Sequence, residues 1–264
     1  MEKLSKIKTI TVKIAAGLAI FTPVFFAIAA LGTKIGLWGW KFGLLTMTRN
    51  IGVKLMLLTF LVAFIALALS VIVKPRTKSW VIALLALAVP VIGLGYGNKV
   101  KAKAAKLPAI HDISTDTQDV PSFSSAIIEA RGGKSNSLDY VGKIDPHTKG
   151  LASVAQVSAY KDVRTLILSA SPKTVHEQSV NTLKKMGLKI VTNEAENGIV
   201  EATYSSFWFG FEDDMVVRVR AGQGGGSVVD TRSVSRVGQS DIGANAARIK
   251  AFNEALQKSL KPAK

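Results

Sequence analysis

Arginine and acidic residues are concentrated near the end of the chain, where five of each lie between Glu212 and Arg248. Guanidinium groups hold carboxylates and phosphates through paired N–H donors, so this composition is typical of an anion site or of an internal ion-pair network. The equal numbers favour the network, in which every charge is used within the fold. A bound phosphate or lipid headgroup is the alternative, and the sequence leaves both open.

The spacing of these residues predicts how they are arranged. Successive residues of a strand point to opposite faces of its sheet. A hairpin turn centred on Gly224 would place Arg218 opposite Asp230, and one face would carry four arginines and one aspartate. Asp213 and Asp214 are adjacent, so we expect their side chains on opposite faces and not as a pair that shares a proton.

A final helix is predicted to begin at Ser240 as its N-cap, and its first backbone N–H groups would attract an anion. The sequence therefore gives these candidate ligand-binding residues: Arg218, Asp230, Arg232, Arg236, Ser240, Asp241, Asn245 and Arg248. The sharpest expectation is that Arg232, Arg236 and Arg248 hold one anion at the helix start. Arg131 is expected to lie outside this cluster.

Catalytic patterns are weak in this chain. The three histidines are far apart in sequence, no cysteine is present, and the serines of the cluster have no evident histidine partner. We therefore predict no catalytic residue, no metal site and no cofactor. A membrane-bound hydrolase or transferase, using the Asp/Arg/Ser cluster on an envelope lipid or polymer, is the competing class of function.

Three uncharged apolar runs, 14–31, 55–73 and 80–96, precede this polar region. Each approaches the ~20 residues that cross a bilayer core, so we predict three transmembrane helices. The expected domains are a membrane domain over 1–106 and a soluble domain over 107–264. The connection between the first two runs is expected to be either an interfacial helix or an ordinary loop.

Charge is divided unequally between the two predicted domains. Fifteen of the 34 basic residues and one acidic residue lie in the first 106 positions, whereas the remainder is nearly neutral. The positive excess beside the apolar runs favours membrane lipids as partners and disfavours nucleic acid. The basic amino-terminal tail and the short basic connection at 74–79 favour a soluble domain outside the cytoplasm. A cleaved signal peptide in place of the first span would leave this orientation unchanged.

The soluble part is predicted to have an α+β fold with an antiparallel sheet and two helices. Extended segments and long loops are expected from Asp112 to Asp162, with regular structure starting near Val163. The elements expected after that point are a strand at 164–169, a helix at 172–186, strands at 188–192, 199–205, 215–220 and 227–236, and the final helix.

A long motif in this region resembles a known family. The run from Asp230 to Ile249 contains Arg-Ser-x-Ser-Arg-x-Gly-x-Ser-Asp-x-Gly-x-Asn, preceded by Phe-Gly-Phe-Glu-Asp-Asp from Phe209. These residues are similar to the domain-of-unknown-function 1499 family of bacteria and plastids, over roughly 110–260. Members that look like exported lipoproteins favour an exported domain here. The resemblance implies no activity, cofactor or catalytic residue.

Together these observations predict an integral membrane protein of the cell envelope, in the bacterial inner membrane, with its carboxy-terminal domain on the non-cytoplasmic side. The domain is expected to bind an anionic ligand, a lipid or a partner protein and to have no enzymatic activity.

Overall fold

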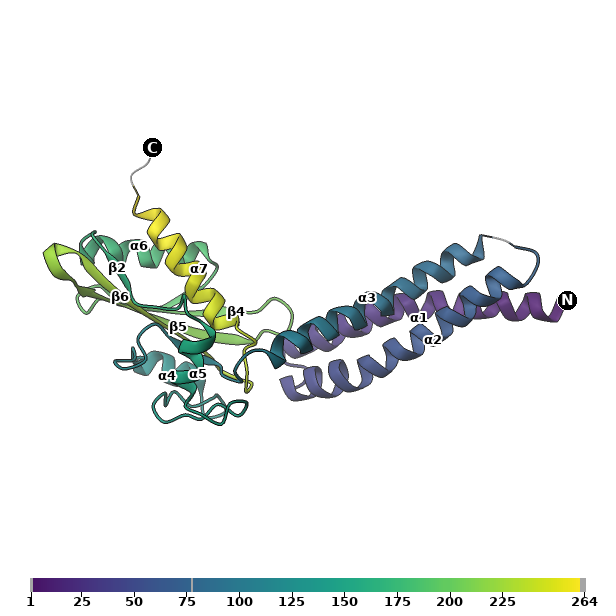
Figure 1. Cartoon of the computed structure of the whole chain (residues 1–264), viewed down its shortest axis with the longest axis horizontal. Coiled ribbons are helices and arrows are strands. Elements are labelled where there is room, and N and C mark those ends of the chain that lie inside the picture. Colours follow the sequence, from purple (N-terminus) through teal and green to yellow (C-terminus); the bar gives the residue numbers. More distant parts are fainter. Residues whose placement is uncertain (1, 77, 262–264) are drawn as a thin grey trace. The chain divides into compact units, whose positions relative to one another are not determined.

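The computed structural model describes residues 2–76 and 78–261 and divides the chain into two compact units (Figure 1). The first unit comprises 1–102 together with 207–210, and the second comprises 103–206 with 211–264. The first unit contains three long apolar helices, and the second contains an antiparallel sheet with further helices. The chain is therefore a membrane protein with an α+β domain, as the sequence predicts.

The helices of the first unit are longer than the uncharged runs. They are α1 (Glu2–Lys34), η1 (Lys41–Gly52), which runs directly into α2 (Val53–Ile72), and α3 (Ser79–Ala105). With η1 and α2 taken together, the described residues contain three helices that are long and apolar enough to cross a membrane. Because η1 is a helix with π hydrogen bonding, the ordinary-loop alternative for this part of the connection is wrong.

Small side chains line the contact between the long helices. The buried residues of this contact are Val12, Ala15, Ala19, Ala63, Ala66, Ala83 and Ala86. Such residues let helix backbones approach closely in lipid, and a hydrogen bond of 3.0 Å between the hydroxyls of Thr22 and Thr59 joins α1 to α2. The Nζ of Lys8 donates to the carbonyls of Val73 and Pro75, at 3.3 and 2.7 Å. The amino-terminal tail thus lies beside the α2–α3 connection.

Within the described residues, the sheet of the second unit has six antiparallel strands. They are β1 (Asp112–Ser114), β2 (Leu166–Leu168), β3 (Lys189–Glu194), β4 (Ile199–Ser205), β5 (Glu212–Ala221) and β6 (Ser227–Ser235). Their order is β1-β6-β5-β4-β3, and β2 pairs with another part of β6. The turn after β5 is centred on Gly224, which has a φ of 64°. Arg218 lies opposite Asp230, so the predicted register is confirmed.

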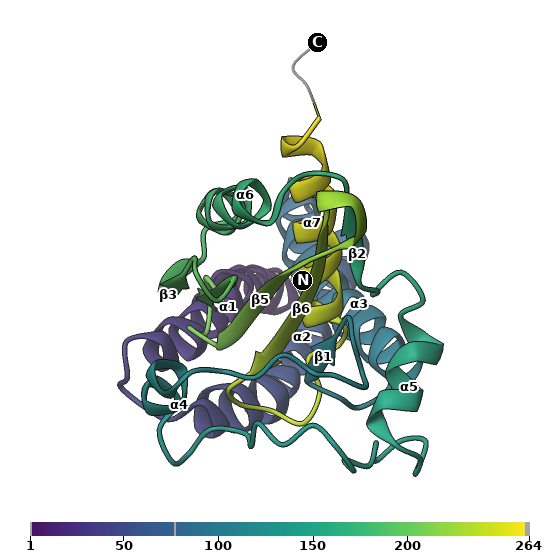
Figure 2. The ribbon, with the colours of Figure 1, turned by 90° about the vertical axis from the view of Figure 1, so that its left-hand side faces the viewer.

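In the part of the chain that the structure describes, four helices pack around this sheet, two more than the sequence predicts. They are α4 (Ser125–Arg131), α5 (Ala152–Ala159), α6 (Pro172–Lys185) and α7 (Ala244–Ser259), and Figure 2 shows α6 and α7 on one side of it. Regular structure therefore begins with β1, so the expectation that it starts near Val163 was wrong, although loops make up most of 112–162. Neither α4 nor α5 has a side-chain N-cap bond of its own, and both are too short to show an apolar period. The start of α4 is instead fixed from outside, because the fully buried Glu201 accepts a hydrogen bond of 2.7 Å from the backbone N–H of Ser124.

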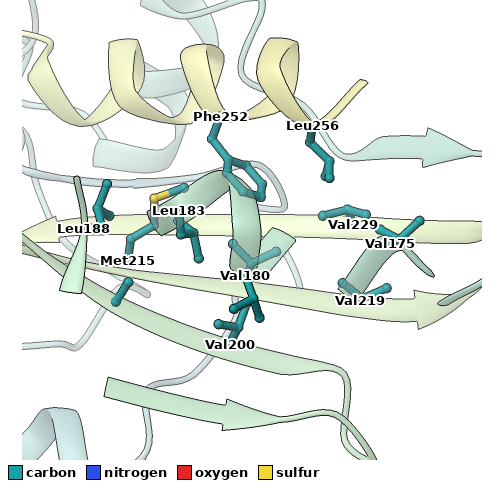
Figure 3. Packing of buried hydrophobic residues seen from close by; sticks show 12 residues of the cluster. Val175, Val180, Leu183, Leu188, Val200, Met215, Val219, Val229, Phe252 and Leu256 are labelled. Carbon is teal, nitrogen blue, oxygen red and sulfur yellow. The ribbon is translucent and has the colours of Figure 1, made fainter. Parts of the chain in front are cut away.

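The main apolar core lies between the sheet and the pair α6 and α7 (Figure 3). Helix α6 starts as predicted, because the Ser171 side chain accepts from the Thr174 N–H and Pro172 occupies the first turn. Phe252 of α7 is completely buried against strand residues such as Met215. Burial of a large side chain of this kind contributes roughly 2–3 kcal/mol. This core supports a sheet whose opposite face is strongly charged.

Candidate functional site

The charged residues of β5 and β6 lie on both faces of the sheet. Asp213 and Asp214 are consecutive in β5 and take partners on opposite sides, as the period of two predicts. Asp213 lies on the side of α7, whereas Asp214 lies on the side of α4. The two carboxylates therefore belong to separate clusters, and they do not form an acid/base pair.

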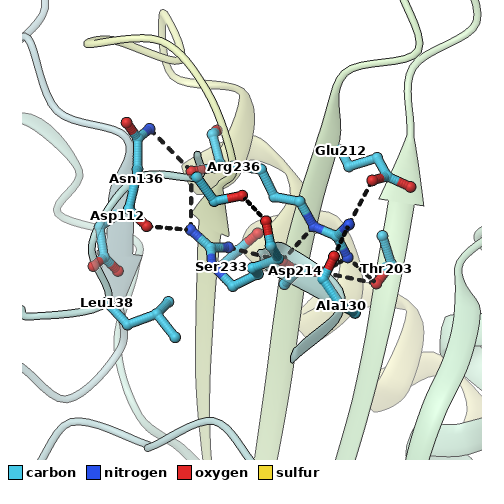
Figure 4. Close-up of polar contacts among 12 residues, drawn as sticks. Asp112, Ala130, Asn136, Leu138, Thr203, Glu212, Asp214, Ser233 and Arg236 are labelled. Atoms are coloured by element: carbon cyan, nitrogen blue, oxygen red, sulfur yellow. Dashed lines mark hydrogen bonds and ion pairs between the residues drawn. The ribbon is translucent and has the colours of Figure 1, made fainter. Parts of the chain in front are cut away.

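Asp214 is the centre of the first cluster (Figure 4). Its carboxylate accepts hydrogen bonds from Arg131 Nη1 at 2.7 Å, from Arg236 Nε and Nη2 at 2.9 and 2.8 Å, and from Thr203 Oγ1 at 2.7 Å. Burial alone raises the pKa of Asp214, but the hydrogen bonds from Arg236, Thr203 and Arg131 outweigh it and hold the pKa below its ordinary value. The carboxylate is fully buried, so its charge is compensated entirely inside the domain.

Arg232 forms the second cluster with Asp112 of β1. Its Nε and Nη2 donate to the two carboxylate oxygens at 2.9 and 2.8 Å, and both side chains are buried. The rings of Phe123 and Tyr140 lie 5.2 and 5.6 Å from the guanidinium carbon. This two-pronged pair fastens β1 to β6, and the rings shield the guanidinium from water.

Arg218 and Arg220 form the third cluster, at the other end of the same face. Asp230 is fully buried and accepts from both guanidinium groups, with a distance of 3.1 Å to Arg218 Nη2. Asp119 lies on the loop after β1, and its carboxylate contacts Arg218 at 3.1 Å and Arg220 at 3.0 Å. The Asp119 side chain is 62% exposed. One carboxylate of this cluster is thus internal and the other faces solvent.

Arg248 of α7 belongs to the opposite face of the sheet. Its Nη2 donates to Asp213 at 2.6 Å, and its guanidinium carbon lies 4.4 Å from the centre of the Tyr204 ring. The neighbouring Asn245 is fully buried and links α7 to β6 through the hydroxyls of Ser233 and Ser235, at 2.7 and 2.9 Å. These polar contacts fix the position of the helix on the sheet.

The start of α7 differs from the sequence prediction. The helix begins at Ala244 with Gly243 as its N-cap, not with Ser240. The carboxylate of Asp241 accepts from the backbone N–H groups of Gly243 and Asn245, both at 2.8 Å. Burial raises the pKa of Asp241, and these two hydrogen bonds reduce that effect. The chain's own carboxylate therefore takes the place that an external anion was expected to fill.

The predicted site residues do not converge on one point. Arg232 and Arg236 lie on the side of α4, whereas Arg248 lies across the sheet on the side of α7, so these three arginines cannot hold a single anion. Sequence reasoning also misplaced Arg131, which shares Asp214 with Arg236. The consecutive apolar residues Ala126, Ile127 and Ile128, shortly before Arg131, were a signal for a short helix in a segment interpreted as loop.

Two acidic partners outside the predicted cluster were missed as well. Asp112 and Asp119 lie more than 90 positions before the arginines that they contact. Only the pairing of β1 with β6 brings that segment to the sheet, and its three residues are too few to show alternation. Among the described residues, no group of three histidine or acidic side chains is placed to hold a metal.

A groove of about 630 Å³ lies beside the third cluster. Arg220 lines it together with Lys173 and His176 of α6 and the turn between β3 and β4. His176 is buried, and its Nε2 is 2.7 Å from the Asn193 side-chain oxygen. The groove places the most exposed arginine of the network next to open space.

Comparison with known families agrees with the motif in β6 and α7. A search of curated proteins finds no match. The profile of the family described as "Protein of unknown function (DUF1499)" matches residues 112–256, which span the sheet and extend into the last turns of α7. That range covers more than half of the chain and contains all three clusters, and the chain belongs to this family.

Proposed function

We propose that this protein is a membrane-anchored binding module of the bacterial cell envelope and that its domain binds an anionic group at Arg218 and Arg220. The observation that supports this is the exposed carboxylate of Asp119, which both arginines contact. Asp230 is buried between the same guanidinium groups and stays as their permanent counter-ion. A phosphate or carboxylate from outside would replace Asp119 without leaving a buried charge unpaired.

The other arginines are poorer candidates for an external ligand. Arg131, Arg232, Arg236 and Arg248 have side chains that are at most 13% exposed, and each pairs with an acidic residue of the fold. Displacing those carboxylates would open the packing between the sheet and its helices. Arg220, in contrast, is 43% exposed and borders the groove. Ligand binding in place of Asp119 requires only movement of one surface loop.

A phosphate titration of the full-length protein in mild detergent tests the proposal. Asp119→Asn removes the competing charge, so phosphate should raise the melting temperature of this variant more than that of the unchanged protein. A tenfold gain in affinity corresponds to about 1.4 kcal/mol at saturating phosphate. Arg220→Ala should remove the response, and Asp162→Asn, at an exposed pair elsewhere, is the matched control.

The proposal fails if phosphate affects Asp119→Asn and Asp162→Asn equally. A response to chloride as large as the response to phosphate would likewise show general screening and no site.

The domain is placed outside the cytoplasm in this proposal. The contacts of Lys8 with the α2–α3 connection put the basic tail and the basic connection at one end of the helices. The concentrated charge of these two short segments favours the cytoplasm for that end. A reporter that is active only outside the cytoplasm should be active when fused after Lys264, and a cytoplasmic reporter at the same point should be inactive. The reverse pattern would overturn the orientation.

A further inference from the structure

Two large aromatic side chains are exposed at the loop between β4 and β5. Phe207 is 68% exposed and Trp208 is 54% exposed, and their rings meet edge to face with centroids 5.2 Å apart. The β3–β4 and β5–β6 turns, at 195–198 and 222–226, have only small and polar residues. Exposed aromatic side chains that gather at one place usually mark an interaction surface.

The register of the sheet places this loop at the end where the chain leaves the membrane helices. Asp112, the first residue of β1, lies opposite Val234, and Ser235 lies opposite Asp213 near the start of β5. The β4–β5 loop leads into β5 at that same end of the sheet. With strands ~4.8 Å apart, the loop is roughly 10–15 Å across the sheet from the entry of β1.

The linker between α3 and β1 is short. Helix α3 ends at Ala105 and β1 begins at Asp112. The six residues between them make seven Cα–Cα steps and reach at most about 25 Å, so β1 begins within that distance of the end of α3. The loop shares that end of the sheet, and this tether keeps its local concentration near the lipid high.

We propose that Phe207 and Trp208 insert into the headgroup region of the membrane that the chain's own helices cross. Tryptophan is enriched at this boundary because its ring is apolar and its N–H is polar. Of the acidic residues just beyond the loop, Asp213 and Asp214 are buried and paired with arginines, and Glu212, which is 43% exposed, pairs with Arg236. Their charges are compensated inside the domain and do not repel anionic headgroups. The loop thereby fixes one end of the sheet at the lipid surface.

The absence of cysteine from the sequence makes a direct test possible. Trp208→Cys, Asn197→Cys and Gln223→Cys each create one labelling site, the last two on turns at the opposite end of the sheet. The full-length variants are labelled with the environment-sensitive fluorophore NBD. They are then reconstituted into vesicles of phosphatidylcholine and phosphatidylglycerol, with and without nitroxide-labelled lipid. The probe at 208 should emit at shorter wavelength and should be quenched several-fold more than the probes at 197 and 223.

Equal quenching at all three positions overturns the proposal. The emission at 208 could instead shift without quenching by nitroxide lipid and vary with the protein-to-lipid ratio. That result would mean that the loop contacts a second copy of the protein, and it also overturns the proposal. Phe207→Cys provides a second site in the same loop and must agree with 208, which guards against a local folding defect in one variant. Phosphate binding at Arg220 is not measured in these assays, so the two proposals can fail independently.

Discussion

Asp214→Asn should be among the most damaging single changes in the domain. The substitution keeps the shape of the side chain but removes the charge that Arg131 and Arg236 share. Among the described residues, Arg131 loses the one acidic side chain that pairs with it, and its own side chain is only 3% exposed. The new amide group also points a donor toward another donor. Breaking a buried ion pair from one side costs about 3–5 kcal/mol, because the remaining charge is left without compensation.

This loss can be measured by hydrogen exchange in the full-length protein in detergent. A loss of about 3 kcal/mol should speed exchange of the core amides of β5 and β6 by roughly a hundredfold, since 1.36 kcal/mol is a factor of ten. Asp162→Asn is the control, because Asp162 and its partner Lys250 are 75% and 52% exposed. That exposed pair should contribute less than about 1 kcal/mol. Similar exchange in both variants would refute the reasoning.

A second control concerns the charge itself. If the cost of Asp214→Asn arises from an uncompensated Arg131, then Arg131→Met in the same protein should restore part of the stability. Acidic pH should also reduce the difference in the free energy of unfolding between the unchanged protein and Asp214→Asn. The folded pKa of Asp214 lies below the ordinary 3.8, so its stabilisation is complete above that pH and is lost as the pH falls through the lowered value. Additive effects of the two changes would contradict this explanation.

Three further predictions use other parts of the domain. Burial, with the nearby charge of Lys143, lowers the pKa of His111 from 6.5, so the unfolded chain binds a proton at this residue more readily than the folded one. The melting temperature should therefore fall as the pH drops below about 6.5, and it should fall less steeply in His111→Gln. Arg218→Ala and Asp230→Ala should be non-additive in a double-mutant cycle, with a coupling of about 1 kcal/mol, since the pair is partly shielded; additive effects would contradict the observed pairing. Gly198→Ala should lower the melting temperature more than Gly225→Ala. Both glycines have positive φ, but a Cβ at 198 would meet the carbonyl of Val219, whereas one at 225 meets open space. Equal losses would show that the contact with Val219 does not matter.

Local patterns were sufficient to predict much of this fold. The uncharged runs, the cap at Ser171 and the alternation on either side of Gly224 each depend on neighbouring residues, and the structure confirms all three. The start of α7 was predicted wrongly because Ser240 and Asp241 both have side chains that can cap a helix. In the structure the carboxylate of Asp241 accepts from the backbone N–H groups of Gly243 and Asn245. The Asp–Arg partners could not be predicted, because nothing near Asp112 in the sequence indicates that it pairs with Arg232, 120 positions later.

The same separation of Asp112 from Arg232 has a consequence for the making of the protein. The first strand after the membrane helices can pair only with the strand that is synthesised last, β6. At about 5–20 residues per second, Arg232 follows Asp112 from the ribosome after about 6–24 s. Until then Asp112 lacks the guanidinium that forms its buried, two-pronged pair. β1 can therefore take its place in the sheet only after nearly all of the domain has been translated.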